Sequence, residues 1–226
     1  MPLIGELAPS FTANTTQGEI KFPEMYKGKW VIMFSHPADF TPVCTTEFMT
    51  FATMAEDFKT LNCELIGLSI DSVYSHIAWL LTIKEKIEYK GMKDVEVQFP
   101  VIADIGMDVA HKYGMMHGQA STTYTVRAVF IIDPDSKIRA ILYYPLSNGR
   151  NMDEIKRLLI AMQTSDKFSV ATPANWQPGD DVIVPPPGSC GSAKDRAAGK
   201  DPDIECLDWF LCLKNIPASK ILGDSK

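Results

Sequence analysis

Between residues 29 and 164, short apolar runs alternate with segments that show helical periodicity. The apolar runs are long enough for buried strands and resemble strands that are covered on both faces. The strand candidates are 29–35, 64–70, 100–103, 126–132 and 138–144. The helix candidates are 43–61, 73–87, 107–113 and 151–162. This order predicts an α/β domain with a mixed central sheet.

The amino-acid composition of the chain changes after about residue 165. Five prolines fall between Pro173 and Pro187, and a Gly/Ser-rich stretch, 188–192, comes after them. This composition predicts a loop-rich extension, not a continuation of the sheet. The extension contains CLDWFLC, residues 206–212, whose apolar side chains need a surface to bury against. We therefore expect a main domain over 1–164 and a C-terminal arm over 165–226 that docks on the main domain or on a neighbouring subunit.

Charge and hydropathy exclude several classes of function. The net charge of −6 disfavours nucleic acid or an anionic membrane as the main partner. No apolar run approaches the roughly 18 residues that a membrane helix needs. The start, MPLIGELAPSF, has neither a basic region nor an apolar core of the kind found in signal peptides. We expect a cytoplasmic protein.

The five cysteines indicate reactive thiol chemistry in a reducing compartment. Their number is odd and their spacing is irregular, unlike a secreted disulfide framework. No C-x-x-C pair occurs, so a structural zinc site is not expected. The four histidines are scattered along the chain, which also argues against a metal site.

Cys44 has the most informative surroundings of the five. It lies in SHPADFTPVCTTE, residues 35–47, directly after a strand candidate. Thr41 is a good N-cap and Pro42 suits the first helical position, which places Cys44 at the third. There the sulfur lies near unpaired backbone N–H groups and the positive end of the helix dipole, and both favour thiolate over thiol.

Arg127 is the one charged residue within the apolar run 126–132. A buried guanidinium is costly unless it is paired. A Cys44 thiolate, with Glu47 one turn further along the helix, could be its partners. The alternative is an arginine at a strand edge whose side chain reaches solvent, and the residues alone leave both open.

The segment around Cys44 resembles a known family. Residues 37–44, PADFTPVC, match the P-x-x-x-T-x-x-C motif of the peroxiredoxins, and the longer string 35–47 resembles their one-cysteine branch, the peroxiredoxin 6 type. The similarity covers nearly the whole chain, through 125–127, 142–145, 149–151 and 173–176. The segment 206–212 looks like that of archaeal members of this branch.

The resemblance implies a thioredoxin-like fold with a C-terminal extension domain. It also implies reduction of hydrogen peroxide and alkyl hydroperoxides without a metal or prosthetic group. By the motif, Cys44 is the peroxidatic nucleophile, Thr41 hydrogen-bonds the thiolate and the bound peroxide, and Pro37 shields the sulfur. Arg127 orients the peroxide and stabilises the thiolate.

Three further residues are matched with the family. Glu47 and Arg150 correspond to a pair that holds Arg127 in place. His36 corresponds to a residue that lines the pocket and contacts the peroxide, and this match is the least specific of the set.

The attack on peroxide leaves Cys44 as a sulfenic acid, which a second thiol must reduce. Many members of this branch lack a resolving cysteine, but this chain carries Cys206 and Cys212. By resemblance to archaeal members, Cys212 is expected to reach Cys44 of the partner subunit. The alternatives are Cys206, which would exchange its disulfide with Cys212, and a one-cysteine cycle with an outside thiol.

The resemblance further implies a thioredoxin-type protein or a low-molecular-weight thiol as the reductant. It implies a homo-oligomer of dimers, with a decameric ring as the family expectation.

Three rival functions differ in how well they fit the sequence. A disulfide oxidoreductase needs a second thiol three residues before the nucleophile, where this chain has Thr41. Lipid hydrolysis, found in some animal relatives, needs a serine motif that 27–31 lacks and that 67–71 only partly matches. A chaperone-like role of a large assembly is left open as a second function.

The remaining cysteines and histidines receive structural interpretations. Cys63 opens a strand candidate and is expected to fill the core, and Cys190 is expected to be exposed in a loop. His76 and His111 are expected to be surface or packing residues of helices. His117 is a loop residue with no evident role.

Overall fold

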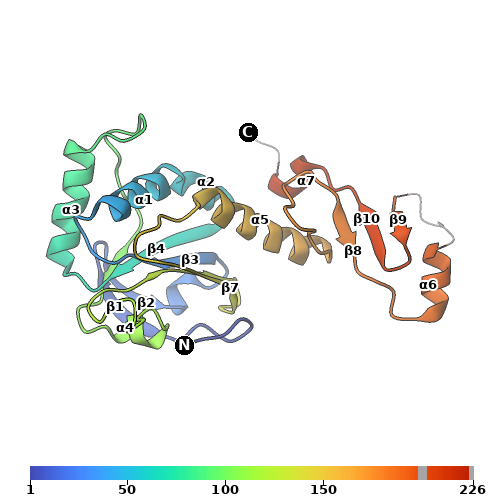
Figure 1. The fold of residues 1–226 in the computed structure, drawn as a ribbon, viewed down its shortest axis with the longest axis horizontal. Coiled ribbons are helices and arrows are strands. Elements are labelled where there is room, and N and C mark those ends of the chain that lie inside the picture. The colour runs from blue at the N-terminus through green and yellow to red at the C-terminus, as the bar shows by residue number, and fades with distance from the viewer. Residues whose placement is uncertain (198–202, 224–226) are drawn as a thin grey trace. The chain divides into compact units, whose positions relative to one another are not determined.

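The computed structural model describes residues 1–197 and 203–223. Within them, seven strands form a mixed sheet in the order β2-β1-β5-β4-β3-β6-β7 (Figure 1). The strands are β1 (Phe11–Thr15), β2 (Gly18–Phe22), β3 (Trp30–Ser35), β4 (Cys63–Ser69), β5 (Val101–Ala103), β6 (Arg127–Ile132) and β7 (Ile138–Tyr144). The central strand β3 runs parallel to β4 and antiparallel to β6. The sequence-based prediction of a mixed sheet is therefore confirmed.

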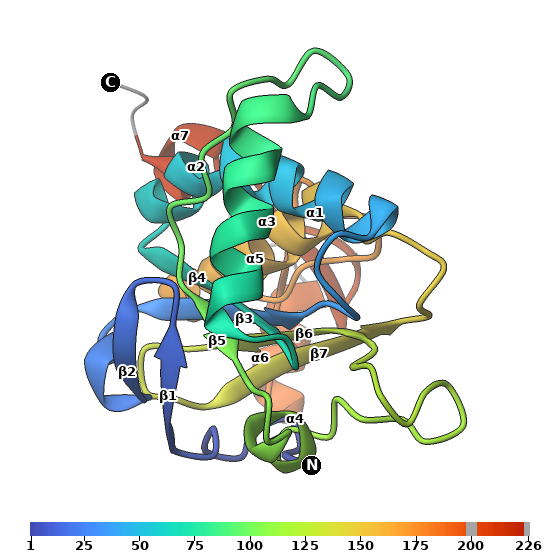
Figure 2. The ribbon, with the colours of Figure 1, turned by 90° about the vertical axis from the view of Figure 1, so that its left-hand side faces the viewer.

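Helices cover both faces of this sheet. Figures 1 and 2 show α1 (Pro42–Thr53) and α2 (Ala55–Thr60) over one face and α4 (Asp108–Lys112) on the opposite side. Helix α3 (Val73–Lys86) comes after β4. Since both faces are covered, every residue of β3 and β6 is buried, including Arg127. No helix in the described ranges is long and apolar enough to cross a membrane.

Three local expectations differ from the structure. The single helix expected over 43–61 is two helices that meet at Met54. The helical pattern over 73–87 places Ile77, Leu80, Leu81 and Lys84 on one side, and in α3 the apolar side chains of Ile77 and Leu81 are exposed. The hairpin of β1 and β2 was not expected, because FTANTTQGEIKF is polar along most of its length.

By compactness, the chain divides into residues 1–152 and 153–226. The composition of the chain changes near residue 165. The boundary from composition and the boundary from compactness are therefore separated by most of helix α5 (Met152–Phe168). The amphipathic pattern of α5 predicts Ile155, Leu158, Leu159 and Met162 on its inward face. Ile155 and Leu159 are fully buried, whereas Leu158 and Met162 are half-buried.

The extension has more regular structure than its composition suggests. Among its described residues, β8 (Val182–Val184), β10 (Leu211–Lys214) and β9 (Glu205–Asp208) form an antiparallel sheet in that order. Two short helices complete it, α6 (Cys190–Ala197) and α7 (Ala218–Leu222). Cys190 is exposed, as expected, but it begins α6 and does not lie in a loop.

Candidate active site

Cys44 lies where the chain passes from β3 into α1. Pro42 is the first residue of α1 and Thr41 is its N-cap residue, so Cys44 occupies the third helical position as predicted. The Thr41 hydroxyl makes no capping bond, however, because it donates to the Ala38 carbonyl at 2.9 Å. Cys44 is fully buried, and Pro37, in the loop before the helix, is also buried.

Arg127 reaches Cys44 from strand β6. Its Nη1 donates to Cys44 Sγ at 3.3 Å and to Glu47 Oε2 at 2.7 Å. Its Nε and Nη2 both donate to the Leu146 carbonyl, at 3.1 and 2.8 Å. The side chain is almost fully buried, so the alternative of an arginine reaching solvent is wrong.

Glu47 joins Arg127 to a second buried arginine. Arg150 Nη2 donates to Glu47 Oε2 at 2.6 Å, and Arg150 Nε donates to Oε1 at 3.0 Å. Arg150 Nη1 donates to the carbonyls of Ser35 and Ala128, which belong to neighbouring strands β3 and β6. The sheet therefore fixes Arg150, Arg150 fixes Glu47, and Glu47 orients Arg127 toward the sulfur.

His36 forms a second buried cluster with His76 and with Asp39, which the sequence did not single out. His36 Nε2 lies 2.9 Å from Asp39 Oδ1, and His76 Nδ1 lies 2.9 Å from Asp39 Oδ2. Burial lowers the pKa of His36 against the opposing effect of Asp39. Burial alone would raise the pKa of Asp39, but the hydrogen bonds from both histidines bring it well below its usual range.

Within the described part of the chain, these three side chains form a group with ligand atoms within 4.8 Å of one another, close enough for a metal ion to bind. His76 was expected to be a surface or packing residue; it is buried and hydrogen-bonded. The three- and four-residue spacing of His76, Trp79 and Ile83 could have indicated that His76 is buried, because these three residues form the buried stripe of α3.

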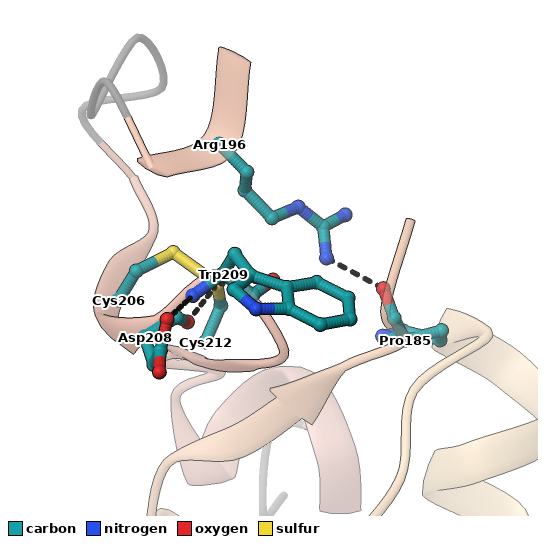
Figure 3. Close-up of a disulfide and its surroundings, with 6 residues drawn as sticks. All are labelled: Pro185, Arg196, Cys206, Asp208, Trp209 and Cys212. Carbon is teal, nitrogen blue, oxygen red and sulfur yellow. Dashed lines mark hydrogen bonds between the residues drawn. A yellow bond between two sulfur atoms is a disulfide. The ribbon is translucent and has the colours of Figure 1, made fainter. Parts of the chain in front are cut away.

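The other cysteines lie in different settings. Cys63 is free and buried, which raises the pKa of its thiol and supports its interpretation as a core residue. Cys206 and Cys212 form a disulfide between paired positions of β9 and β10 (Figure 3). Leu207, Trp209 and Phe210, between them, are exposed. Cys212 itself is buried, and its role in resolution stays a prediction.

Comparison with known proteins agrees with this geometry. Residues 4–141 match the AhpC/TSA family, and residues 161–199 match the C-terminal domain of 1-Cys peroxiredoxin. A peroxiredoxin of Methanosarcina mazei is 69% identical over 214 residues, covering 95% of this chain and 98% of the relative.

Two solved structures share the fold. The yeast mitochondrial 1-Cys peroxiredoxin is 41% identical with a TM-score of 0.82, over 96% of this chain and 100% of that one. A mutant of peroxiredoxin 6 from Arenicola marina is 34% identical with a TM-score of 0.81, over 96% and 99%. The chain thus has the thioredoxin-like fold expected from its sequence, belongs to the peroxiredoxin family, and is a thiol-dependent peroxidase.

Proposed function

We propose that Cys44 is the peroxidatic thiolate and that peroxide binds between Cys44, Thr41 and Arg127. The observation that carries this proposal is the 3.3 Å contact between Arg127 Nη1 and Cys44 Sγ in a buried site. Arg127, Arg150 and Glu47 together carry one excess positive charge, which an anionic sulfur would cancel. Burial makes this balance important, because an unpaired charge is costly there.

Hydrogen-bonding capacity supports the same binding site. A guanidinium has five N–H donors, and four of those of Arg127 are engaged with Cys44, Glu47 and Leu146. The fifth, on Nη2, can donate to a peroxide oxygen. The Thr41 hydroxyl donates to Ala38, so its oxygen remains as an acceptor for the peroxide proton. Buried Pro37 keeps solvent from the sulfur, and His36 lines the pocket.

In this reaction, the Cys44 sulfur attacks one peroxide oxygen and the O–O bond breaks. The leaving oxygen departs as water or an alcohol after gaining a proton, and Cys44 becomes a sulfenic acid. Negative charge builds on the departing oxygen, where a fixed guanidinium stabilises it best. The proposed substrates are hydrogen peroxide and alkyl hydroperoxides.

We propose that Cys212 of the partner subunit resolves the sulfenic acid. Its thiol would displace water to form a disulfide with Cys44. Cys206 would then attack Cys212, releasing reduced Cys44 and leaving the Cys206–Cys212 disulfide that the structure contains. An external dithiol, such as a thioredoxin-type protein, would reduce that disulfide. Because Cys44 is fully buried, α1 or its preceding loop must move to bring the sulfurs together.

A one-cysteine cycle is the second candidate. Both arm cysteines are already bonded to each other in the structure, so an outside thiol would have to reduce Cys44 whenever that pair stays oxidised. The structural work on the related yeast protein concerns resolution through glutathione/thioredoxin systems.

Assembly into rings of dimers is supported by exposed apolar side chains near the site. Phe40, on the loop before α1, and Tyr74, Ile77 and Leu81, on α3, are between 43% and 80% exposed. The Asp39–His76 contact places this loop beside α3. We propose that this surface joins dimers, with a decamer as the family model. A chaperone-like activity of the ring is the candidate for a second role.

The test is to treat the reduced protein with one equivalent of hydrogen peroxide and map cross-links by non-reducing electrophoresis and mass spectrometry. A dimer joined through Cys44 and Cys212, accumulating in Cys206→Ser, supports the two-cysteine cycle. Monomer with oxidised Cys44 alone supports the one-cysteine cycle. Cys190→Ser is the matched control and should behave as the wild type. An unmodified Cys44 would refute the peroxidatic role.

A further inference from the structure

His76 faces hydrogen-bond acceptors at both of its ring nitrogens. Its Nδ1 lies 3.0 and 2.9 Å from the two Asp39 carboxylate oxygens, and its Nε2 lies 3.1 Å from the Ile102 carbonyl oxygen. A neutral imidazole has one donor nitrogen and one acceptor nitrogen. The carbonyl can only accept, so Nε2 carries a proton. The contact at Nδ1 then needs another proton, either on His76 or on Asp39.

The neighbouring groups indicate where that proton lies. The side chains of His36, His76 and Asp39 are at most 1% exposed. Hydrogen bonds from both histidines lower the pKa of Asp39, although burial opposes them, so the carboxyl is ionised. Burial lowers the pKa of His36, which is therefore neutral and donates through Nε2. The extra proton accordingly lies between His76 Nδ1 and the Asp39 carboxylate, which the two share.

One further charged group faces this cluster. Asp71, just after β4, accepts a hydrogen bond from the Asp39 backbone N–H at 3.0 Å. The Ser69 hydroxyl also donates to Asp71, at 2.6 Å. Asp71 adds negative charge near the histidines, which favours keeping the shared proton.

The cluster connects two elements, a helix and a strand, to the catalytic loop. Asp39 lies between Pro37 and Thr41, on the segment that joins β3 to α1. His76 belongs to α3, and Ile102 belongs to β5. The Asp39–His76 contact therefore ties the loop that carries Thr41 to a helix and a strand outside the catalytic site.

We propose that the proton shared by His76 and Asp39 locks this loop in its catalytic position, which makes both residues positioning residues of the peroxidase. Without that proton, the Nδ1 lone pair faces a carboxylate oxygen at 2.9 Å, and the two repel each other. Thr41, two residues from Asp39, then loses its position. The proposal rests on the role of Thr41 and Cys44 proposed above.

Asp39→Asn tests the shared proton separately from the hydrogen bonds, because this variant can keep every hydrogen bond of the cluster without that proton. The amide oxygen can accept from His36 Nε2, while the amide N–H₂ donates to a lone pair on His76 Nδ1. All contacts of the cluster are then satisfied with a neutral His76. This variant should keep the loop in place without any shared proton. His76→Ala, in contrast, removes the contact between Asp39 and α3 altogether.

The first readout is the second-order rate constant for Cys44 oxidation by hydrogen peroxide, measured by tryptophan fluorescence across pH. Buried Trp79, whose ring centroid lies 5.1 Å from that of His36, is a suitable reporter. In the wild type, the rate should fall on the alkaline side by about tenfold per pH unit, as loss of one proton requires.

Asp39→Asn should lose this alkaline limb and keep the acid limb that reflects thiolate formation. His76→Ala should be slower at every pH, and His111→Asn, on an exposed helix position, should match the wild type. An alkaline limb that persists in Asp39→Asn, or a wild type without one, would overturn the role of the shared proton.

The second readout does not depend on peroxidase activity. With ¹⁵N-histidine labelling, the chain gives signals from four histidines, and His76→Ala identifies the one of interest. Both nitrogens of His76 should be protonated at neutral pH in the wild type, and only Nε2 in Asp39→Asn. A neutral His76 in the wild type would contradict the proposal. So would a stoichiometric metal ion that the wild type retains and Asp39→Asn loses.

Discussion

Arg127 Nη1 and Cys44 Sγ lie 3.3 Å apart, although 83 residues separate them in the chain. This contact can act on the thiolate, on the transition state, or on both. For cysteine thiols in general, a fall in pKa from about 8.5 to about 6 raises the thiolate fraction at neutral pH roughly 30-fold. The same change lowers intrinsic nucleophilicity roughly tenfold, if the Brønsted slope of thiol–disulfide exchange applies. Activation of the thiol alone therefore gives only about a threefold gain, and fast peroxide reduction must depend on stabilising the departing oxygen.

Arg127→Ala should consequently lose far more rate than its thiolate fraction explains. Removal of one fixed donor from a transition state of this kind typically costs about 10²–10³ in rate. The measurement is the rate of Cys44 oxidation by peroxide at several pH values, combined with a thiolate titration of the same variant. Arg139→Ala, whose partner is Asp133, is the control and should retain the wild-type rate. A loss that tracks thiolate fraction alone would contradict this account.

Thr41→Val tests the acceptor side of the site. Valine has the same shape as threonine but cannot accept the peroxide proton, and it also loses the bond to Ala38. We expect the rate of Cys44 oxidation by peroxide to fall even at pH values where Cys44 is fully ionised. The midpoint of the pH dependence of that rate should not change to match. Thr53→Val, near the end of α1, removes a similar hydroxyl-to-backbone bond far from the sulfur and should leave the rate unchanged.

Glu47→Gln should destabilise the protein strongly. The carboxylate balances two buried arginines, and removing one partner of a buried ion pair typically costs about 3–5 kcal/mol. Urea unfolding of the reduced protein measures the effect. Glu96→Gln removes an exposed carboxylate paired with Lys84 at 2.9 Å, and it should change the midpoint little. Equal midpoints for the two variants would argue against a stabilising role for the buried network.

The central strands and the start of α1 could be predicted because local signals specify them. The apolar run 126–132 forms a buried strand in any sheet covered on both faces, and Thr41-Pro42 marks a helix start in most contexts. The same logic gave a buried, paired Arg127 as one of two alternatives, since a charge inside such a strand requires a partner, and the family resemblance then favoured it.

Other features depend on tertiary contacts that residue type alone does not reveal. His76 is polar by type, yet it is buried through its bonds to Asp39 and Ile102. Ile77 and Leu81 are apolar but exposed, which fits a helix that is buried again in an assembly. The small sheet of the extension escaped prediction because its strands are only three or four residues long.

Tyr26→Phe should change how stability depends on alkaline pH. Burial, aided by the Glu64 carboxylate, raises the pKa of Tyr26 to about 12, from near 10 in an unfolded chain. Between these values the unfolded state releases a proton that the folded state keeps, so stability falls as pH rises. The variant lacks this loss, and its urea midpoint should decline less than that of the wild type between about pH 9 and about pH 11. Tyr74→Phe alters a tyrosine that is 80% exposed and should behave as the wild type. Because the wild type and Tyr26→Phe share every other alkaline group, an equal decline in the two would show that Tyr26 ionises alike in the folded and unfolded states.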